Sequence, residues 1–421
     1  MDKIDQITES ILKKIDGAGF KQEGAYNLRY NGQALCHGDS EYIKIKRKED
    51  RQGIDVYISG EAQGEQVHIP VVVSASGMTD VVYNDFYIGE GADIKIVAGC
   101  GIHNSGCNET RHDGIHAFHV GKHAKVVYEE KHYGEGEGTG KNILNPVTQI
   151  YLEEGAVFTL DTVQIRGVDS TERRTDVDMG PDSRLYVVEK LMTHDRQTAV
   201  SNMEVRMNGD GSSAQIVSRS VAKGTSRQTF HPNAVGNALC KAHIQCDSII
   251  MDGAQVCSIP EIDARNIDAQ IIHEAAIGRI NTEQLLKLRS FGMSEEEAEN
   301  VIIDNFLRYA LRTVNGYDIE RIKKIEEVFR QIMLYCAKIF GRLAFRKYNE
   351  NGRRGPMNKA IFELWCVCFK GLTKEQLEKI VLNKGEFLKQ FGSLLKNDEF
   401  NLLLKAGDEY STIRRIDIAR K

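Results

Sequence analysis

Short stretches of alternating apolar and polar residues recur along much of this chain. Each stretch has an apolar pair, a polar turn with Gly, and a run in which every second residue is apolar. Copies begin near Tyr87, His119, Tyr151, Asp178, Val205 and Ile250, and the first five starts are separated by 32, 32, 27 and 27 residues. Repetition at this period predicts a parallel β-helix, a solenoid whose coils share one core. The alternative is a β-sandwich, in which turns come every 8–12 residues or so without similarity between units.

Helical periodicity replaces the alternation at both ends. Residues 1–20 place isoleucines at helical spacing among charged residues, which predicts an amphipathic helix and not a signal peptide. After Ile280, Asn281 or Thr282 begins a short helix, and Ser294 to Glu297 forms a capping box for a second. Further helices are expected over residues 319–348, 358–369, 373–382 and 385–395. The predicted organisation is a helical segment at 1–30, a β-helix at 31–280, a helical segment at 281–312 and an all-α module at 313–421.

Charge divides the chain in the same way. Residues 313–421 carry 22 Lys and Arg against 14 Asp and Glu, whereas residues 1–312 carry 33 against 46. The tail is therefore basic and the body acidic, which indicates two modules. Nine cysteines without dense regular spacing do not predict a disulfide framework, and no apolar run reaches membrane-spanning length. We expect a cytoplasmic protein with reduced thiols.

Cysteine and histidine residues gather in one part of the predicted β-helix. Cys100, His103 and Cys107 are followed by His112, His116, His119, His123 and His132. Thiolates and imidazoles are the ligands that zinc and other borderline metals prefer. The favoured interpretation is a polar ladder of histidines on the solenoid surface, with Cys100 and Cys107 packed inside. A zinc site built from Cys100, His103 and Cys107 is the alternative.

A second candidate segment runs from His243 to Ile280. In an alternating strand Cys246 lies between Gln245 and Asp247, and this polar surrounding favours a thiolate that accepts sulfur or binds metal. His273 and Glu274 are adjacent, so in a regular strand they point to opposite faces. A bulge or a strand end would be needed for both to serve one site.

The segments from Cys100 to Arg312 resemble the SufB/SufD family of iron–sulfur cluster assembly scaffolds. The resemblance rests on motifs that occur in order, among them HDGIHAFHVGKHAKVVYEEKHYGEGEGTG, NPVTQIYLEEGAV, IVSRSVAKGTSRQ, QCDSIIMD and HEAAIGRINTEQLLKLRSFGMSEEEAE. It implies a right-handed parallel β-helix and a transient iron–sulfur cluster as cargo. At His273-Glu274-Ala275 the chain looks SufB-like, whereas Ile272 stands where longer SufB proteins carry a carboxylate. The chain looks similar to the compact scaffolds of minimal SufB–SufC systems.

The resemblance also implies roles for particular residues and partners. Cys246 corresponds to the cysteine that receives sulfur or ligates the cluster, and His273 and Glu274 to further candidate ligands. The helices at 281–312 would dock a SufC-type ABC ATPase that hydrolyses ATP, so the chain itself is expected to be no enzyme. Candidate docking residues are Glu283, Leu286, Phe291 and Glu296. A second SufB/SufD-like subunit, as a homodimer, a sulfur donor and client apoproteins complete the expected partners.

Residues 325–418 resemble the helical C-terminal region of GmrSD-type restriction-related proteins in short motifs around Phe340, Pro356 and Arg414. The nuclease portion of that family is absent from the sequence, so no nuclease activity is inferred. The basic tail is interpreted as a solvated helical surface, and nucleic-acid binding is not expected. A β-helical enzyme acting on polysaccharide is a third possible function, but it would need several groove carboxylates and aromatic sugar platforms, and the chain has one Trp.

Overall fold

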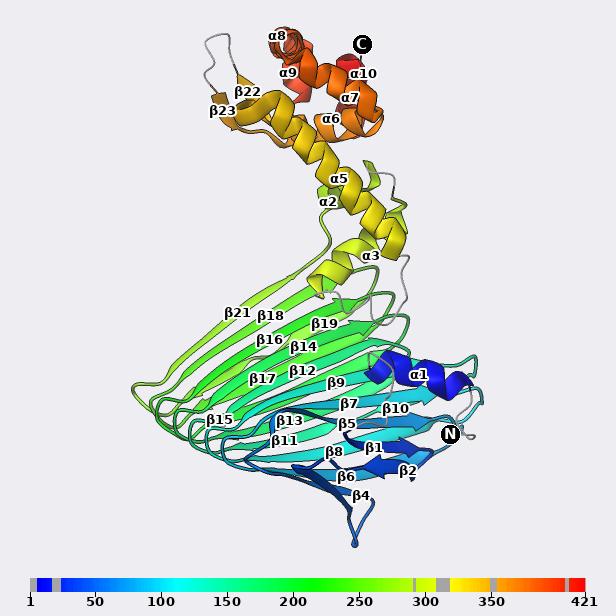
Figure 1. The fold of residues 1–421 in the computed structure, drawn as a ribbon, viewed down its shortest axis with the longest axis vertical. Coiled ribbons are helices and arrows are strands. Elements are labelled where there is room, and N and C mark those ends of the chain that lie inside the picture. The colour runs from blue at the N-terminus through cyan, green and yellow to red at the C-terminus, as the bar shows by residue number, and fades with distance from the viewer. Residues whose placement is uncertain are drawn as a thin grey trace. The chain divides into compact units, whose positions relative to one another are not determined.

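The computed structural model describes residues 6–16, 24–290, 293–307, 319–348, 354–405 and 409–420. Contacts divide the chain into two compact units, Met1–Arg279 with Ile303–Asn315, and Ile280–Ile302 with Gly316–Lys421. The first is a solenoid of stacked strands, coloured blue to green in Figure 1, and the second is largely helical. None of the helices in these described stretches has the length and apolar character needed to cross a bilayer.

Two sheets form the solenoid, and the chain alternates between them through successive coils. Sheet A contains, in spatial order, β2 (Gln33–Gly38), β1 (Ala25–Tyr30), β5 (Gln63–Val73), β7 (Asp93–His103), β9 (Lys125–Glu135), β12 (Val157–Arg166), β14 (Arg184–Thr193), β16 (Ser213–Ala222), β18 (Lys241–Ile250) and β21 (Gln270–Gly278). Sheet B contains β19 (Gln255–Ser258), β17 (Arg227–Gly236), β15 (Thr198–Met207), β13 (Ser170–Met179), β10 (Asn142–Leu144), β8 (Thr110–Val120), β6 (Thr79–Ile88), β4 (Gly53–Ile58) and β3 (Ile43–Arg47), with β11 (Val147–Leu152) beside β8 and β13, and β20 (Glu261–Ala264) beside β17. Pairing is parallel except for β1–β2 and β3–β4. The predicted parallel β-helix is confirmed.

The strand register reproduces the first five starts of the repeat seen in the sequence, whereas the sixth, Ile250, ends β18 in sheet A and Val235 takes the matching position in sheet B. Tyr87 lies opposite His119, His119 opposite Tyr151, and Tyr151 opposite Asp178. Asp178 lies opposite Arg206, one residue later than the predicted start at Val205. An earlier coil, in which Tyr57 lies opposite Tyr87, was missed. Inward-facing residues of successive coils stack and form one continuous core between the sheets; Phe86 and Phe118, for example, lie with ring centroids 4.6 Å apart.

Helix α1 (Gln6–Asp16) packs on the outer face of sheet A, next to β5, β7 and β9. Ile11 and Ile15 are fully buried there, because Gly99 and Gly101 let the helix approach closely. A Cβ atom at Gly101 would lie 2.1 Å from a methyl group of Ile11. At the helix end, Lys14 donates to Glu135 over 2.6 Å. The predicted amphipathic helix is present, but β1 lies inside residues 1–30 and belongs to sheet A, so the solenoid begins earlier than predicted.

The helical unit has its own core. Within the described residues, its helices and 3-10 helix are α2 (Thr282–Ser290), the part of α3 (Glu295–Phe306) before Ile303, α5 (Ile319–Phe340), η1 (Gly341–Leu343), α6 (Lys359–Lys370), α7 (Lys374–Leu382), α8 (Lys384–Leu394), α9 (Asp398–Leu403) and α10 (Glu409–Arg420). Trp365 is buried among phenylalanines, with its ring 4.8 Å from that of Phe391. The predicted capping box is confirmed, since Ser294 and Glu297 exchange hydrogen bonds of 2.7 and 3.2 Å.

The expected helix over 319–348 is too long. Helix α5 ends at Phe340, because Gly341 adopts a left-handed backbone with φ of 52° that ends the helix. The chain then forms an antiparallel hairpin of β22 (Arg346–Tyr348) and β23 (Arg354–Met357).

Candidate functional site

Cys246 and His273 meet on the inner face of the last strands of sheet A. The Cys246 Sγ atom lies 3.3 Å from the His273 Nε2 atom. Cys246 belongs to β18 and is 3% exposed, whereas His273 on the edge strand β21 is only partly buried. Ala275 lies directly opposite Cys246, which places His273 on the same face one step along its strand. The structure therefore brings together two of the three predicted ligands.

Glu274 lies on the other face of the same strand. The β18–β21 register runs without a shift from Lys241 to Ile249, so no bulge reorients the side chain. Instead, the Glu274 Oε2 atom lies 3.4 Å from the Nε2 atom of His243 on β18. This pair was not predicted. Each β18 residue lies opposite the β21 residue 29 positions later in the sequence, so Gln245 lies opposite Glu274. His243 is the next residue on the same face of β18, which brings it close to Glu274.

Burial controls the charge of the candidate thiol. The pKa of Cys246 is raised to about 11, chiefly by burial and in smaller part by the carboxylates of Glu189 and Asp247, against the lowering effect of a hydrogen bond with Ser258. At neutral pH the group is therefore a thiol. His273 is placed to accept its proton when a thiolate is needed, since imidazole is the usual base for an activated cysteine.

The second candidate set is dispersed. Cys100 is buried beside Val71 and Ile102, and burial raises its pKa well above the usual value. Cys107 is exposed, which corrects the expectation that it packs inside. The Nδ1 atom of His103 lies 3.8 Å from a Glu135 oxygen. Over the residues whose structure is described, no three His, Cys, Asp or Glu side chains gather where they could hold a metal ion.

The histidines between these positions also differ from the prediction of a surface ladder. His112 and His116 are buried on the inner face of β8, where the His112 Nδ1 atom lies 3.0 Å from Asp80 and the His116 Nδ1 atom 2.6 Å from the Tyr128 hydroxyl. Burial lowers the pKa of His116 to about 4, so this imidazole is neutral. His123 lies beyond the end of β8 at a φ of 57° and therefore shares no strand face with His119.

A buried ionic group continues this polar interior. Arg173 on β13 donates to Glu130 on β9, both side chains being almost inaccessible to solvent. The Tyr128 hydroxyl donates to Glu130 over 3.1 Å, and His132 lies 3.6 Å from the same carboxylate. Although burial alone would raise the pKa of Glu130, Arg173 together with His132 and His116 outweighs burial and holds the pKa well below the usual range. Charged residues thus occupy part of the solenoid core.

Three of the four predicted docking residues can be placed. Glu283 and Leu286 belong to α2, and Glu296 is exposed in the first turn of α3. Glu283 lies 3.6 Å from Lys359 of α6. Phe291 falls outside the described residues.

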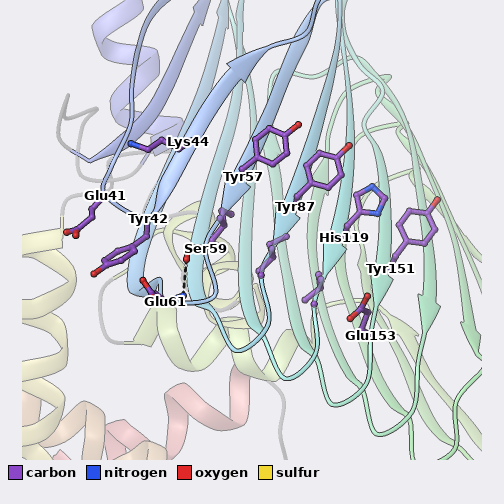
Figure 2. Close-up of a pocket in the computed structure, with 15 residues that line it drawn as sticks. Glu41, Tyr42, Lys44, Tyr57, Ser59, Glu61, Tyr87, His119, Tyr151 and Glu153 are labelled. Carbon is purple, nitrogen blue, oxygen red and sulfur yellow. Dashed lines mark hydrogen bonds between the residues drawn. The ribbon is translucent and has the colours of Figure 1, made fainter.

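The outer face of sheet B carries a row of aromatic rings away from this site. Figure 2 shows Tyr57, Tyr87, His119 and Tyr151 side by side on four neighbouring strands, lining a pocket of about 870 Å³. Their centroids are 5.0–5.1 Å apart and the rings are nearly parallel. Since Tyr87 and His119 each have a ring neighbour on both sides, their faces are not open for a sugar to stack on. This arrangement does not favour a polysaccharide-acting function.

Comparison with known proteins identifies the family. Residues 85–306 match the model of the SUF system FeS cluster assembly, SufBD core domain, which is just over half of the chain. A protein of Archaeoglobus fulgidus named "Iron-sulfur cluster assembly SufBD family protein" is 25% identical over 69% of this chain and 78% of its own length. Relatives with the same family name from Methanocaldococcus jannaschii and Pyrococcus horikoshii are 24% and 26% identical, over 57% and 63% of this chain and 76% and 81% of their own lengths. The chain therefore belongs to the SufBD family of iron–sulfur cluster assembly proteins.

Proposed function

We propose that this protein is a scaffold subunit on which a nascent iron–sulfur cluster is built in the cytoplasm and then passed to client proteins. The contact between Cys246 and His273 carries the proposal. The thiol of Cys246 can accept sulfur. The imidazole of His273, 3.3 Å away on the last strand of sheet A, can act as its base and as a second ligand. The nine free cysteines support a reducing compartment.

Sulfur transfer to Cys246 follows ordinary thiol chemistry. His273 takes the thiol proton, and the resulting thiolate attacks the outer sulfur of a persulfide on a donor protein. The new S–S bond forms on Cys246 while the old one breaks, and the donor leaves as a thiolate. The cluster is cargo and not a resident cofactor, so a site with few thiolates suits its release better than a set of four.

A second copy of the chain is the proposed completing partner. Strand β21 is the edge of sheet A, and edge strands expose backbone groups that can pair with another chain. Isoleucines of the last coil are exposed, including Ile262, Ile272 and Ile277. An apolar, unpaired edge next to Cys246 and His273 fits a homodimer in which the site is shared between subunits.

Anaerobic reconstitution with Fe²⁺ and sulfide tests the scaffold function. The wild-type protein should gain visible charge-transfer absorption, Cys246→Ser should lose it almost completely, and His273→Ala should retain a small fraction. Cys257→Ser, which changes an exposed cysteine of the same coil, is the matched control and should behave as wild type. Sedimentation of the same samples should show two copies in the loaded protein. Full absorption in Cys246→Ser would reject the scaffold site.

We also propose that α2 and α3 dock a SufC-type ABC ATPase, which would leave ATP hydrolysis to that partner. Glu296→Lys should reduce co-purification with the ATPase about tenfold, because it reverses a charge on the docking surface. Glu375→Lys makes the same change in the exposed first turn of α7 and should have no effect. Equal recovery of the ATPase with both variants would show that the docking surface lies elsewhere.

A further inference from the structure

Alternation along β21 separates the predicted ligands into two groups. Even-numbered positions of β18 face inward with Cys246, and their outward neighbours include His243. On β21 His273 faces inward and Glu274 outward. Because successive side chains of a strand point to opposite faces, a cluster in contact with Cys246 and His273 lies across the sheet from Glu274 of the same subunit.

The outer pair has donor atoms suited to ferrous iron. The His243 Nε2 and Glu274 Oε2 atoms are 3.4 Å apart, so both can approach one ion, and the two side chains are 38% and 65% exposed. Imidazole nitrogen and carboxylate oxygen are the ligands of many non-haem Fe(II) sites. Asp247 lies on the same outward face of β18, where Gln245 donates to its Oδ2 atom over 2.7 Å. The surface around the pair is therefore polar and open to hydrated ions.

We propose that His243 and Glu274 form a separate Fe²⁺-binding pair on the outer face of β18 and β21, and that Glu274 is not a ligand of a cluster held by Cys246 and His273. This inference rests on the proposed scaffold function, which requires iron near the sulfur acceptor. Two protein ligands leave the remaining coordination positions of Fe²⁺ to water. Such binding is weak and exchangeable, as is appropriate for iron that is handed on.

Another histidine–glutamate pair of the solenoid provides a comparison. The His231 Nε2 atom on β17 lies 3.1 Å from Glu261 on β20, so the two pairs have the same residue types and similar spacing. The His231 Nε2 atom, however, is buried. The two imidazole side chains are almost equally exposed, at 36% and 38%, so burial of the Nε2 atom is the difference that should make His231 the weaker iron site.

NMR of the full-length protein labelled at the histidine Cε1 carbon tests the proposal, with anaerobic Fe²⁺ as a paramagnetic probe. The signal that disappears in His243→Gln identifies His243. It should broaden at a lower Fe²⁺ concentration than the His231 signal, and Glu274→Gln should raise the concentration required about tenfold or more. Glu261→Gln should leave the broadening of His243 unchanged.

Failure of this inference and failure of the scaffold function give different results. Broadening of His243 that persists in Cys246→Ser supports a separate iron pair whether or not a cluster forms. Retention of cluster absorption in Glu274→Gln supports the exclusion of Glu274 from the inner site. Equal broadening of His231 and His243 would overturn the proposal, as would loss of cluster absorption in Glu274→Gln when that of the wild type is intact.

Discussion

Arg173→Met should lower the free energy of unfolding of the solenoid by about 3–5 kcal/mol, because it leaves the Glu130 carboxylate buried without its cation. Urea unfolding monitored by circular dichroism measures the change. Arg174→Met removes the neighbouring arginine, which pairs with Asp176 on the surface, and should cost no more than about 1 kcal/mol. Similar losses in both variants would contradict the assigned role of the buried pair.

The loss in the free energy of unfolding caused by Arg173→Met should also depend on pH. Without Arg173, burial should raise the pKa of Glu130 above its unfolded value against the smaller lowering effects of His132 and His116, so the folded state holds the proton more tightly. The stabilising effect of protonation is present at low pH and is lost as pH rises through the new pKa. The difference from wild type should therefore be smaller at pH 5 than at pH 8, and adding Glu130→Gln should recover part of it at pH 8. A deficit independent of pH would indicate a packing defect alone.

Gly167→Ala should destabilise the solenoid by about 3 kcal/mol or more, the sum of backbone strain and overpacking. Gly167 has a φ of 72°, and a Cβ atom there would lie 1.8 Å from the backbone oxygen of Gly134 on the adjacent strand. Because backbone and not a movable side chain blocks the space, the coil must shift.

Gly91→Ala isolates the strain component of this effect. Gly91 has a φ of 75°, but a Cβ atom there would meet nothing within 4 Å. Its cost should be about 1–2 kcal/mol, as expected for a non-glycine residue in the left-handed region. Thermal unfolding of the two variants gives the comparison. If Gly167→Ala were no less stable than Gly91→Ala, the close backbone approach would not constrain the coil.

The repeat made the solenoid predictable, because residues that stack in successive coils must be alike. The repeat was missed at Tyr57, because the antiparallel β3–β4 pair interrupts the parallel coils there. It was displaced by one residue at Arg206, because the number of residues per coil changes there. In the tail, the β22–β23 hairpin was not predicted, and helices α9 and α10 were expected only as part of an all-α module, without bounds of their own. Short elements of this kind depend on packing more than on their own periodicity.

The interior polar residues were predictable in principle. His112, His116 and Phe118 share the parity of inward positions on β8, and Asp80 and Asn84 occupy the matching positions one coil earlier. The prediction instead relied on the general rule that histidine prefers the surface. In the structure, these polar residues pair with one another in the core, and that pairing compensates for their burial. The Cys246–His273 contact required both alternation and the register of the strands, and the register alone disclosed His243 as the neighbour of Glu274.

The position of Trp365 has a practical consequence for spectroscopy. It is the single tryptophan of the chain and is buried among the phenylalanines of the helical unit, whereas the aromatic residues of the solenoid are tyrosines and phenylalanines. Selectively excited tryptophan emission therefore reports unfolding of the helical unit by itself, while far-UV circular dichroism follows both units together. Whether the two units unfold together or in sequence can be read from one unlabelled sample.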